Sequence, residues 1–358
     1  MEVVNHIIPW DIGEATLITT PIVGVQVTTF DCGGVAICVH VSHTIADGFA
    51  GATFIHAWSV ASRVGVDEVV RPSFDLASIF HARDTSMFKS PPPQDTRSKI
   101  VTKGFIFEKQ AISRLGAKVA GLLEYDHQHF NEKFLRVNGT MSGCDPGFYF
   151  GGKPPLAVNT SNMVEAPLVR TSQPSRVELV ACTIWKPLTD VSQAKHGHSR
   201  TSVLCLSLNL RGRTGITTSE NSLGNFYIQV PTKFMKTGEM ELHDLVNILR
   251  NKLRSVTASS RKLSNSDDVC ITVMNHLDQD MHDGNIDVHH FTSLCKFPFY
   301  ETDFGWGKPC WVTTPSASFE VVSMVDTSFG TGVEVKVSLN EVDMKEFECH
   351  PDFVEFTP

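Results

Sequence analysis

Short apolar runs rich in β-branched residues recur near the start of the chain and predict β-strands. Three of them are Ala15–Thr20, Val23–Phe30 and Val35–Val41, in which Val, Ile and Thr suit a pleated sheet. The sequence DCGG separates the second run from the third, so we expect a β-hairpin there. Apolar positions then recur at helical spacing from Phe49 to Arg63. This spacing predicts a helix whose apolar stripe lies in the core.

The rest of the chain alternates irregularly between predicted helices and strands. Apolar residues recur at helical spacing at 109–123, 176–195, 242–256 and 344–347, with a short element at 271–275. The strand-like runs lie at 100–107, 203–210, 226–232, 288–294, 319–326 and 333–339. The alternation favours α/β layers built on mixed sheets over a doubly wound nucleotide-binding fold. No glycine-rich phosphate loop is present in the sequence.

Two stretches interrupt this pattern. Residues 83–99 contain three consecutive prolines and no periodicity, which is typical of a linker or surface crossover. Residues 125–170 are rich in Gly, Pro, Asn and Ser, and an irregular run of that length is unusual inside a compact domain. We hypothesise that this second stretch is an atypical insertion or a gene-model artefact, which sequencing of the transcript would decide.

Composition places the chain among cytoplasmic globular proteins. Its 358 residues exceed one ordinary core and suggest two domains, and 41% hydrophobic with 20% charged residues is typical of soluble proteins. A net charge of −8 without a basic run argues against nucleic acid as a partner. No run is long enough to cross a membrane, and the first residues lack the order of a secretory signal. Nine scattered cysteines without a CxxC pair indicate reduced thiols.

The sequence SHTIADG at 42–48 places a histidine where a predicted strand ends and a predicted helix begins. Side chains at a strand end can face a cavity, and Gly48 allows a sharp turn there. The unperturbed pKa of histidine lies near neutrality, which suits His43 for proton transfer. Asp47, four residues on, can fix the local geometry or pair with a cation. A histidine beside an apolar strand is nevertheless more often a core residue than a catalyst.

Two other segments place charges at turns. The sequence DFGWGKP from Asp303 to Pro309 surrounds a tryptophan with two glycines and begins with an acid, which indicates a rigid apolar turn. The sequence NLRGR at 209–213 ends a predicted strand, and arginine is the usual partner of a carboxylate that must stay ionised. Asp47 and Asp303 could therefore bridge to arginines and hold distant segments together. A solvated basic turn at 209–213 fits the sequence equally well.

Together, HTIADG at 43–48 and DFGWG at 303–307 resemble the two signatures, HxxxD and DFGWG, of the plant BAHD acyltransferases. Both motifs are complete and in the family's order, and the pair is specific although HxxxD alone is weak. The segments TIWK at 183–186, NLRGR at 209–213 and LGN at 223–225 are also similar to stretches between the signatures. The resemblance extends over nearly the whole chain except 125–170, and within the family it is greatest to the vinorine synthase-like clade.

This resemblance implies an α/β fold of two chloramphenicol-acetyltransferase-like domains, with mixed β-sheets, flanking helices and an active-site channel between them. Residues 1–83 would be the remnant of an N-terminally truncated first domain that carries HxxxD, because family members have further elements before this motif. Residues 84–99 would be the crossover linker. Residues 100–358 would form the second domain, which carries DFGWG and the atypical insertion at about 125–170.

The resemblance also implies an activity, the transfer of an acyl group from acyl-CoA to a hydroxyl of a plant specialised metabolite such as an alkaloid. By clade the acyl group is expected to be acetyl. His43 would act as the base, and Asp47, followed by Gly48, would be structural and bridge to Arg211. The enzyme would be an acyltransferase that transfers groups other than aminoacyl groups.

The remaining site residues are also carried by the resemblance. Asp303, Gly305, Trp306 and Gly307 would hold the domain arrangement and the CoA side of the channel. Thr292 would donate a hydrogen bond to the oxyanion, a role that the resemblance gives to this threonine. Relatives often read Phe-Thr-Ser-Trp at this place, and this chain has Phe-Thr-Ser-Leu at 291–294.

The same resemblance implies which molecules the protein would meet. We expect no bound cofactor and no metal, acyl-CoA as co-substrate, a small-molecule acceptor, no nucleic acid, no membrane, and a cytoplasmic monomer. Two alternatives remain open from the sequence: a catalytically impaired, truncated or pseudogene-derived product, and an N-acyltransferase.

Overall fold

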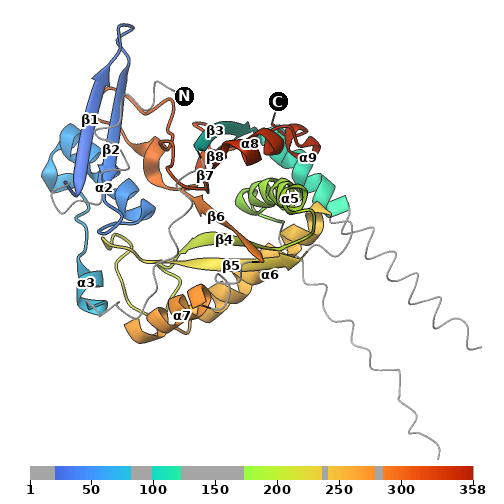
Figure 1. Ribbon diagram of the computed structural model, residues 1–358. Helices are drawn as coiled ribbons and strands as arrows, with labels where there is room; N and C mark the ends of the chain where they lie inside the picture. The colour runs from blue at the N-terminus through green and yellow to red at the C-terminus, as the bar shows by residue number, and fades with distance from the viewer. Residues whose placement is uncertain (1–20, 82–98, 122–172, 236–240, 279–284, 358) are drawn as a thin grey trace, which may run out of the picture.

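The computed structural model describes residues 21–81, 99–121, 173–235, 241–278 and 285–357. The segment before residue 82 contains the strands β1 (Val23–Thr29) and β2 (Val35–Val41), the helix α2 (Gly48–Val64), the 3₁₀ turn η2 (Val66–Glu68) and the short helix α3 (Asp75–Ile79). It lies beside a larger body formed by the rest of the described chain (Figure 1). The strand predicted at 15–20, most of the linker at 84–99 and the insertion at 125–170 lie outside the described residues.

The predicted hairpin is confirmed. β1 and β2 pair antiparallel from Val23 opposite Val41 to Thr29 opposite Val35. The turn closes with a hydrogen bond of 2.8 Å from the Gly33 amide to the Phe30 carbonyl, and Gly33 has φ of 81°, which a glycine adopts without strain. The strand β2 of this hairpin therefore leads directly into the turn that contains His43.

A six-stranded mixed sheet in the order β3-β8-β7-β6-β4-β5 forms the larger body. The β4–β6 and β6–β7 pairs are parallel and the other pairs are antiparallel, so the predicted mixed sheet is confirmed. Its strands are β3 (Ile100–Phe107), β4 (Thr201–Asn209), β5 (Tyr227–Met235), β6 (Ile286–Ser293), β7 (Val321–Asp326) and β8 (Val333–Asn340).

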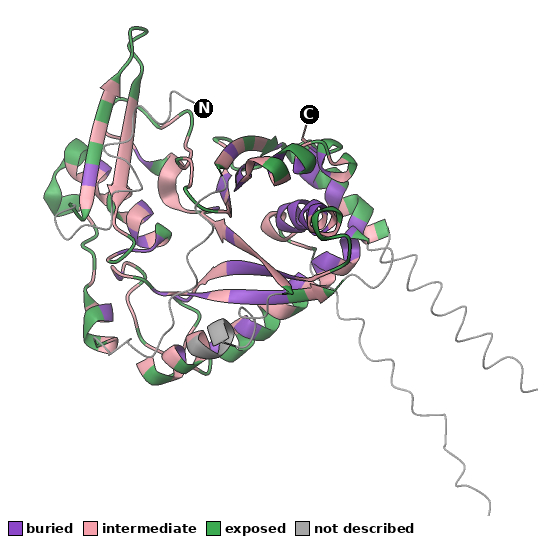
Figure 2. Cartoon of the chain, in the orientation of Figure 1, coloured by how far each residue is buried: buried purple, intermediate pink, exposed green. Residues whose placement is uncertain are grey.

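Helices cover this sheet and close its core. They are a helix at 109–121, α5 (Arg176–His196), α6 (Leu242–Ser260), α7 (Ser266–Asp278), α8 (Glu341–Phe347) and α9 (Pro351–Val354), whereas the 3₁₀ turn η4 (Pro298–Glu301) packs against α2. The sheet curves around α5, where the buried residues concentrate (Figures 1 and 2). Trp185 on α5 is fully buried, and its indole N–H donates to the Ser202 hydroxyl at 2.8 Å. Within the described part of the chain, no helix is long and apolar enough to cross a bilayer.

The structure departs from the sequence prediction at several helices. α7 spans thirteen residues, Ser266–Asp278, where the sequence predicts only a short element at 271–275. The missed signal is a helix start, because the Asn265 side chain accepts a hydrogen bond of 2.9 Å from the Asp268 amide. The elements η2, α3, η4 and α9 are also absent from the prediction, since runs of three to five residues are too short to show helical periodicity.

The predicted burial of the apolar stripe on α2 is wrong in part. Ala50 and Ala52 are buried, but Phe54 is 41% exposed. Much of the stripe lines an open apolar groove of about 620 Å³, whose other walls are Val25 of β1, residues 66–74 and the 221–223 loop. Helical spacing predicted the stripe correctly, but only a covering layer can bury it, and these walls leave the groove open.

We expect Trp185→Ala to lower the free energy of unfolding by about 3–5 kcal/mol, because it removes a large buried side chain and leaves the Ser202 hydroxyl without its partner. Urea denaturation followed by circular dichroism measures this change. The matched control is Phe329→Ala, which removes an aromatic ring that is 89% exposed and should stay within about 0.5 kcal/mol of the parent. Equal effects of the two substitutions would contradict the assignment of Trp185 to the core.

Candidate active site

His43 lies in the turn between β2 and α2, and the polypeptide around it is held by local hydrogen bonds. The Ser42 amide donates to the Ile22 carbonyl at 2.8 Å, and the Ile45 amide donates to the Ser42 carbonyl at 3.1 Å. The hydroxyls of Ser42 and Thr44 are 2.8 Å apart. His43 itself is exposed, so the turn presents its imidazole at the surface. The predicted position of His43, at the end of a strand, is confirmed.

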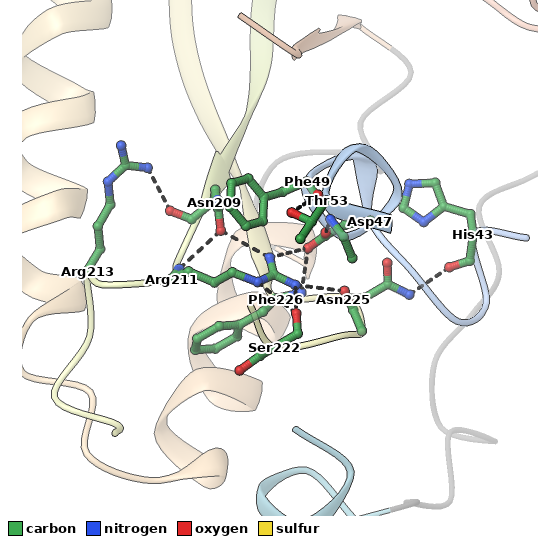
Figure 3. Close-up of polar contacts among 12 residues, drawn as sticks. His43, Asp47, Phe49, Thr53, Asn209, Arg211, Arg213, Ser222, Asn225 and Phe226 are labelled. Carbon is green, nitrogen blue, oxygen red and sulfur yellow. Dashed lines mark hydrogen bonds and ion pairs between the residues drawn. The ribbon is translucent and has the colours of Figure 1, made fainter. Parts of the chain in front are cut away.

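Asp47 is buried beneath this turn and begins α2 (Figure 3). Its Oδ1 accepts from the Ala50 amide at 2.9 Å, which is the N-cap bond of the helix. Its Oδ2 accepts from the Phe226 amide at 2.9 Å and from Arg211 at 2.7 Å. Its own amide donates to the Gly224 carbonyl at 3.2 Å. The carboxylate is thus fully occupied on the side of the turn away from the His43 imidazole.

The predicted ion pair between Asp47 and Arg211 is present and buried, with only 3% of the Arg211 side chain exposed. Besides Asp47, the guanidinium donates to Asn209 Oδ1 at 3.2 Å, to the Ser222 carbonyl at 3.0 and 3.1 Å, and to the Gly224 carbonyl at 2.9 Å. These five bonds use all five of its N–H groups. The alternative of a solvated turn is therefore wrong for Arg211.

The residues from Gly224 to Tyr227 contact the 43–47 turn along its length. The Asn225 side chain donates to the His43 carbonyl at 2.6 Å, and the next amide, that of Phe226, donates to Asp47. The ring of Tyr227 then lies 5.9 Å from the His43 ring, centroid to centroid, at 59°. LGN at 223–225 is similar to the family in sequence, but no local pattern singles out Tyr227, because its contact with His43 depends on how β5 meets the turn.

Burial raises the pKa of the Tyr227 phenol above its usual value, and the nearby negative charge of Asp47 raises it further. Both causes disfavour the phenolate. Tyr227 is therefore an uncharged hydrogen-bonding group at neutral pH.

Gly48 allows the turn to pack closely on the end of β6. A Cβ at this position would lie 2.6 Å from Leu294 Cδ2, so any larger residue would force the leucine to move. The next residue, Phe49, meets Phe297 edge to face at 5.3 Å between ring centroids. Thr292 lies two residues before Leu294, half-buried on β6 opposite Ser323 of β7. The turn that contains His43 therefore lies near the end of β6 that carries Thr292.

The DFGWG segment packs at the opposite end of α2. Oδ1 of Asp303 accepts from the amides of Gly305 at 2.8 Å and Gly307 at 3.0 Å, and these bonds hold the pKa of the carboxyl below its usual value. The Asp303 amide donates to the Ser59 hydroxyl at 3.3 Å, and Oδ2 pairs with Arg63 at 3.4 Å. The predicted bridge at Asp303 is thus made by Arg63 of α2.

Aromatic rings complete this second contact. Phe304 meets Trp58 of α2 edge to face at 4.7 Å and stacks on Trp306 at 5.7 Å between centroids. Trp306 is 68% exposed. Arg213, the other arginine of NLRGR, is exposed and donates to the Asn209 carbonyl at 2.7 Å.

The structure therefore separates the predicted site residues into two groups. His43, Asp47, Gly48 and Arg211 meet at the N-terminal end of α2, with Thr292 on the adjacent strand. Asp303, Gly305, Trp306 and Gly307 lie at its C-terminal end, and the 17 residues of the helix span about 25 Å. DFGWG, in the segment that follows η4, thus contacts the C-terminal end of α2 and lies away from His43.

Two further histidines, His289 and His290, lie on β6. His289 on β6 is half-buried, and desolvation of its ring lowers its pKa to about 4, so it remains neutral. Burial also lowers the pKa of His290. Among the residues that the structure describes, no three His, Cys, Asp or Glu side chains are grouped so that they could hold a metal ion.

We expect Asp47→Asn and Arg211→Gln each to lower the free energy of unfolding by about 3–5 kcal/mol, because each leaves the other buried charge without its partner. The double variant should lose less than the sum of the two single losses. Urea denaturation of all four proteins gives this coupling. Lys345→Gln is the control, since the Lys345–Glu341 pair is largely exposed and should contribute no more than about 0.5 kcal/mol. Strictly additive losses would contradict a direct interaction.

We expect Gly305→Ala to destabilise the protein by about 1–3 kcal/mol, because Gly305 has φ of 108°, where alanine is strained. A Cβ there would meet only Arg63 Cγ at 4.0 Å, so sterics add little. Gly51→Ala in α2 is the matched control. No atom lies within 4 Å of its added Cβ, and alanine in a helix should stabilise by about 0.5–1 kcal/mol. Thermal denaturation distinguishes the two, and a stabilising Gly305→Ala would be the contrary result.

Comparison with known proteins identifies the same family as the two motifs. A family model described as Transferase family matches residues 2–354. Acetyl-CoA-benzylalcohol acetyltransferase of Clarkia breweri is 28% identical over 344 residues, which cover 94% of this chain and 70% of the relative. Pelargonidin 3-O-(6-caffeoylglucoside) 5-O-(6-O-malonylglucoside) 4'''-malonyltransferase of Salvia splendens is 30% identical, with 92% of this chain and 68% of the relative covered.

The fold agrees with a solved structure of the same kind. The crystal structure of vinorine synthase matches with a TM-score of 0.67 and 25% identity, and the match covers 94% of this chain and 66% of that one. The chain thus spans about two thirds of the length of the relatives that it matches. The acyltransferase fold predicted from the motifs is confirmed. The chain belongs to the Transferase family, that is, to the BAHD acyltransferases whose HxxxD and DFGWG signatures it carries.

Proposed function

We propose that this protein is an acyl-CoA-dependent O-acyltransferase that moves an acyl group, acetyl in the first instance, from CoA to a hydroxyl of a plant specialised metabolite such as an alkaloid. The observation that carries the proposal is the arrangement at the N-terminal end of α2. There an exposed His43 imidazole is presented by a turn that is fixed from below by the buried Asp47–Arg211 pair.

His43 is the proposed base. An alcohol is a weak nucleophile at neutral pH, so an imidazole nitrogen takes the hydroxyl proton as the oxygen attacks the thioester carbonyl. The carbon–oxygen bond forms, the carbon–sulfur bond then breaks, and the imidazolium returns the proton to the CoA thiolate. A positioned base of this kind contributes about 10²–10⁴-fold to a rate.

Asp47 supports this chemistry without sharing in it. Its carboxylate is engaged by Arg211 and by two backbone amides, so it has no free oxygen directed at His43. This arrangement differs from a Ser-His-Asp triad, in which the carboxylate is hydrogen-bonded to the imidazole. The task of Asp47 in the proposal is to fix the turn and the first residues of α2.

Thr292 is the proposed donor to the oxyanion that forms when the alcohol attacks. Its position two residues before Leu294, which packs on Gly48, supports this role. The side chain of Leu294 has no donor, and its amide donates to the Met324 carbonyl at 2.8 Å. A preformed donor matters because losing one lowers the rate by roughly 10²–10³-fold at comparable sites.

The proposed substrates follow from the relatives. One is named for acetyl-CoA and benzyl alcohol, another is named as a malonyltransferase of a glucoside, and one matching solved structure is vinorine synthase. Acetyl is therefore the first donor to test and malonyl the second. Acceptors with an aromatic or alkaloid hydroxyl are the first class to test, and a matching amine examines N-acylation.

The test is single-variant kinetics with labelled acetyl-CoA, read as ester product by liquid chromatography and mass spectrometry. We expect His43→Ala to lower kcat by about 10²–10⁴-fold with an unchanged melting temperature, because the side chain is exposed. His198→Ala is the matched control, since it removes another exposed imidazole and should retain full activity. No turnover by the parent protein with any donor and acceptor, or an unaffected His43→Ala, would overturn the proposal.

A further inference from the structure

Tyr227 is the first residue of β5, and strand geometry directs its side chain to the His43 turn. Its neighbours Phe226 and Ile228 are both buried in one apolar cluster with Leu76, Leu210, Val230, Val256 and Val269. Because side chains alternate along a strand, Tyr227 projects from the opposite face. Its ring lies beside the His43 imidazole, with 5.9 Å between centroids and an interplanar angle of 59°.

Little else holds the His43 side chain. The main chain of the turn is fixed through the His43 carbonyl, which accepts from Asn225. Across the described chain, however, no group hydrogen-bonds to a ring nitrogen of His43, and Asp47 is occupied by Arg211. An exposed side chain in this situation would exchange between rotamers. The Tyr227 ring is the contact that distinguishes one orientation from the others.

We propose that Tyr227 is a positioning residue that holds the His43 imidazole in the orientation needed for proton transfer. The inference rests on the proposed function of His43 as the base. A tilted pair of rings is a favoured arrangement of aromatic side chains, and proton transfer requires the base to lie within hydrogen-bond reach of the acceptor hydroxyl.

The electrostatics agree with a role for the ring itself. Burial and the charge of Asp47 both raise the pKa of the Tyr227 phenol, so the ring carries no charge near neutral pH. The Tyr227 ring therefore contacts His43 as a neutral aromatic ring across the pH range in which an imidazole can act as a base. Phenylalanine would preserve this contact, whereas leucine would remove the ring.

The first arm of the experiment is spectroscopic and needs no turnover. The Cε1–Hε1 resonance of His43 is assigned in a ¹H–¹³C correlation spectrum by its loss in His43→Ala. We expect Tyr227→Phe to keep the shift of this resonance away from its unfolded value. Tyr227→Leu should move it toward that value while the other histidine signals stay. Phe329→Leu, at a ring that is 89% exposed, is the control and should change nothing. A His43 signal that is insensitive to Tyr227→Leu would overturn the inference.

The second arm is kinetic. We expect Tyr227→Leu to lower kcat by about 10–100-fold with KM for acyl-CoA unchanged, since misplacement of a reacting group acts on the chemical step. Tyr227→Phe should restore most of kcat. An equal loss in Tyr227→Phe and Tyr227→Leu would assign the effect to the hydroxyl and overturn the positioning role.

The two arms separate the inference from the proposed function. Full activity in Tyr227→Leu beside an inactive His43→Ala would reject the positioning role and leave His43 as the base. An inactive parent protein would reject the proposed function. In that case the spectroscopic arm still decides whether Tyr227 orients the imidazole.

Discussion

The buried ion pair between Asp47 and Arg211 is the constraint on which the rest of this structure depends. The two residues are 164 positions apart in the chain, so the pair joins the segment of β1, β2 and α2 to the six-stranded sheet. Burying two opposite charges is unfavourable unless the remaining donors and acceptors are satisfied. Here they are, because every guanidinium N–H and both carboxylate oxygens have partners. The ion pair thus has one defined geometry. Because Asp47 belongs to the turn that contains His43, the pair fixes the position of that turn.

The helix α2 is held in position at both of its ends. Its N-terminal end is fixed by Asp47, and its C-terminal end is fixed by Ser59 and Arg63, which contact Asp303. The two signature motifs therefore lie at the two ends of one fixed helix, although His43 and Asp303 are 260 residues apart in the sequence. Under the proposed function, DFGWG acts on the reaction through this helix and contains no reacting group. Because both ends of α2 are fixed, the direction of the helix axis is fixed. The turn that contains His43 precedes the helix directly, so its orientation is fixed as well.

Local patterns predicted the elements well, whereas contacts between elements were predictable only in part. The β1–β2 hairpin, α5 and the strands of the mixed sheet follow from periodicity and turn residues, which are local properties. The Asp47–Arg211 pair was predictable because a buried acid in a motif needs a cation and the resemblance offered Arg211. The contact of Tyr227 with His43 was not, since it depends on where β5 begins relative to a turn far away in sequence. The exposure of Phe54 could not be read from helical spacing either, because burial is decided by neighbouring layers.

The distance along the chain between Asp47 and Arg211 also has a consequence for biosynthesis. At about 5–20 residues per second, a ribosome needs roughly 8–33 s to proceed from one partner to the other. During that interval the β1–β2 hairpin exists without the sheet that anchors it. Val27 and Val35 on this hairpin are exposed even in the finished fold, and unpaired apolar strands are prone to join other chains. The hairpin is therefore the part of the nascent chain most open to wrong strand pairing until Arg211 has been synthesised.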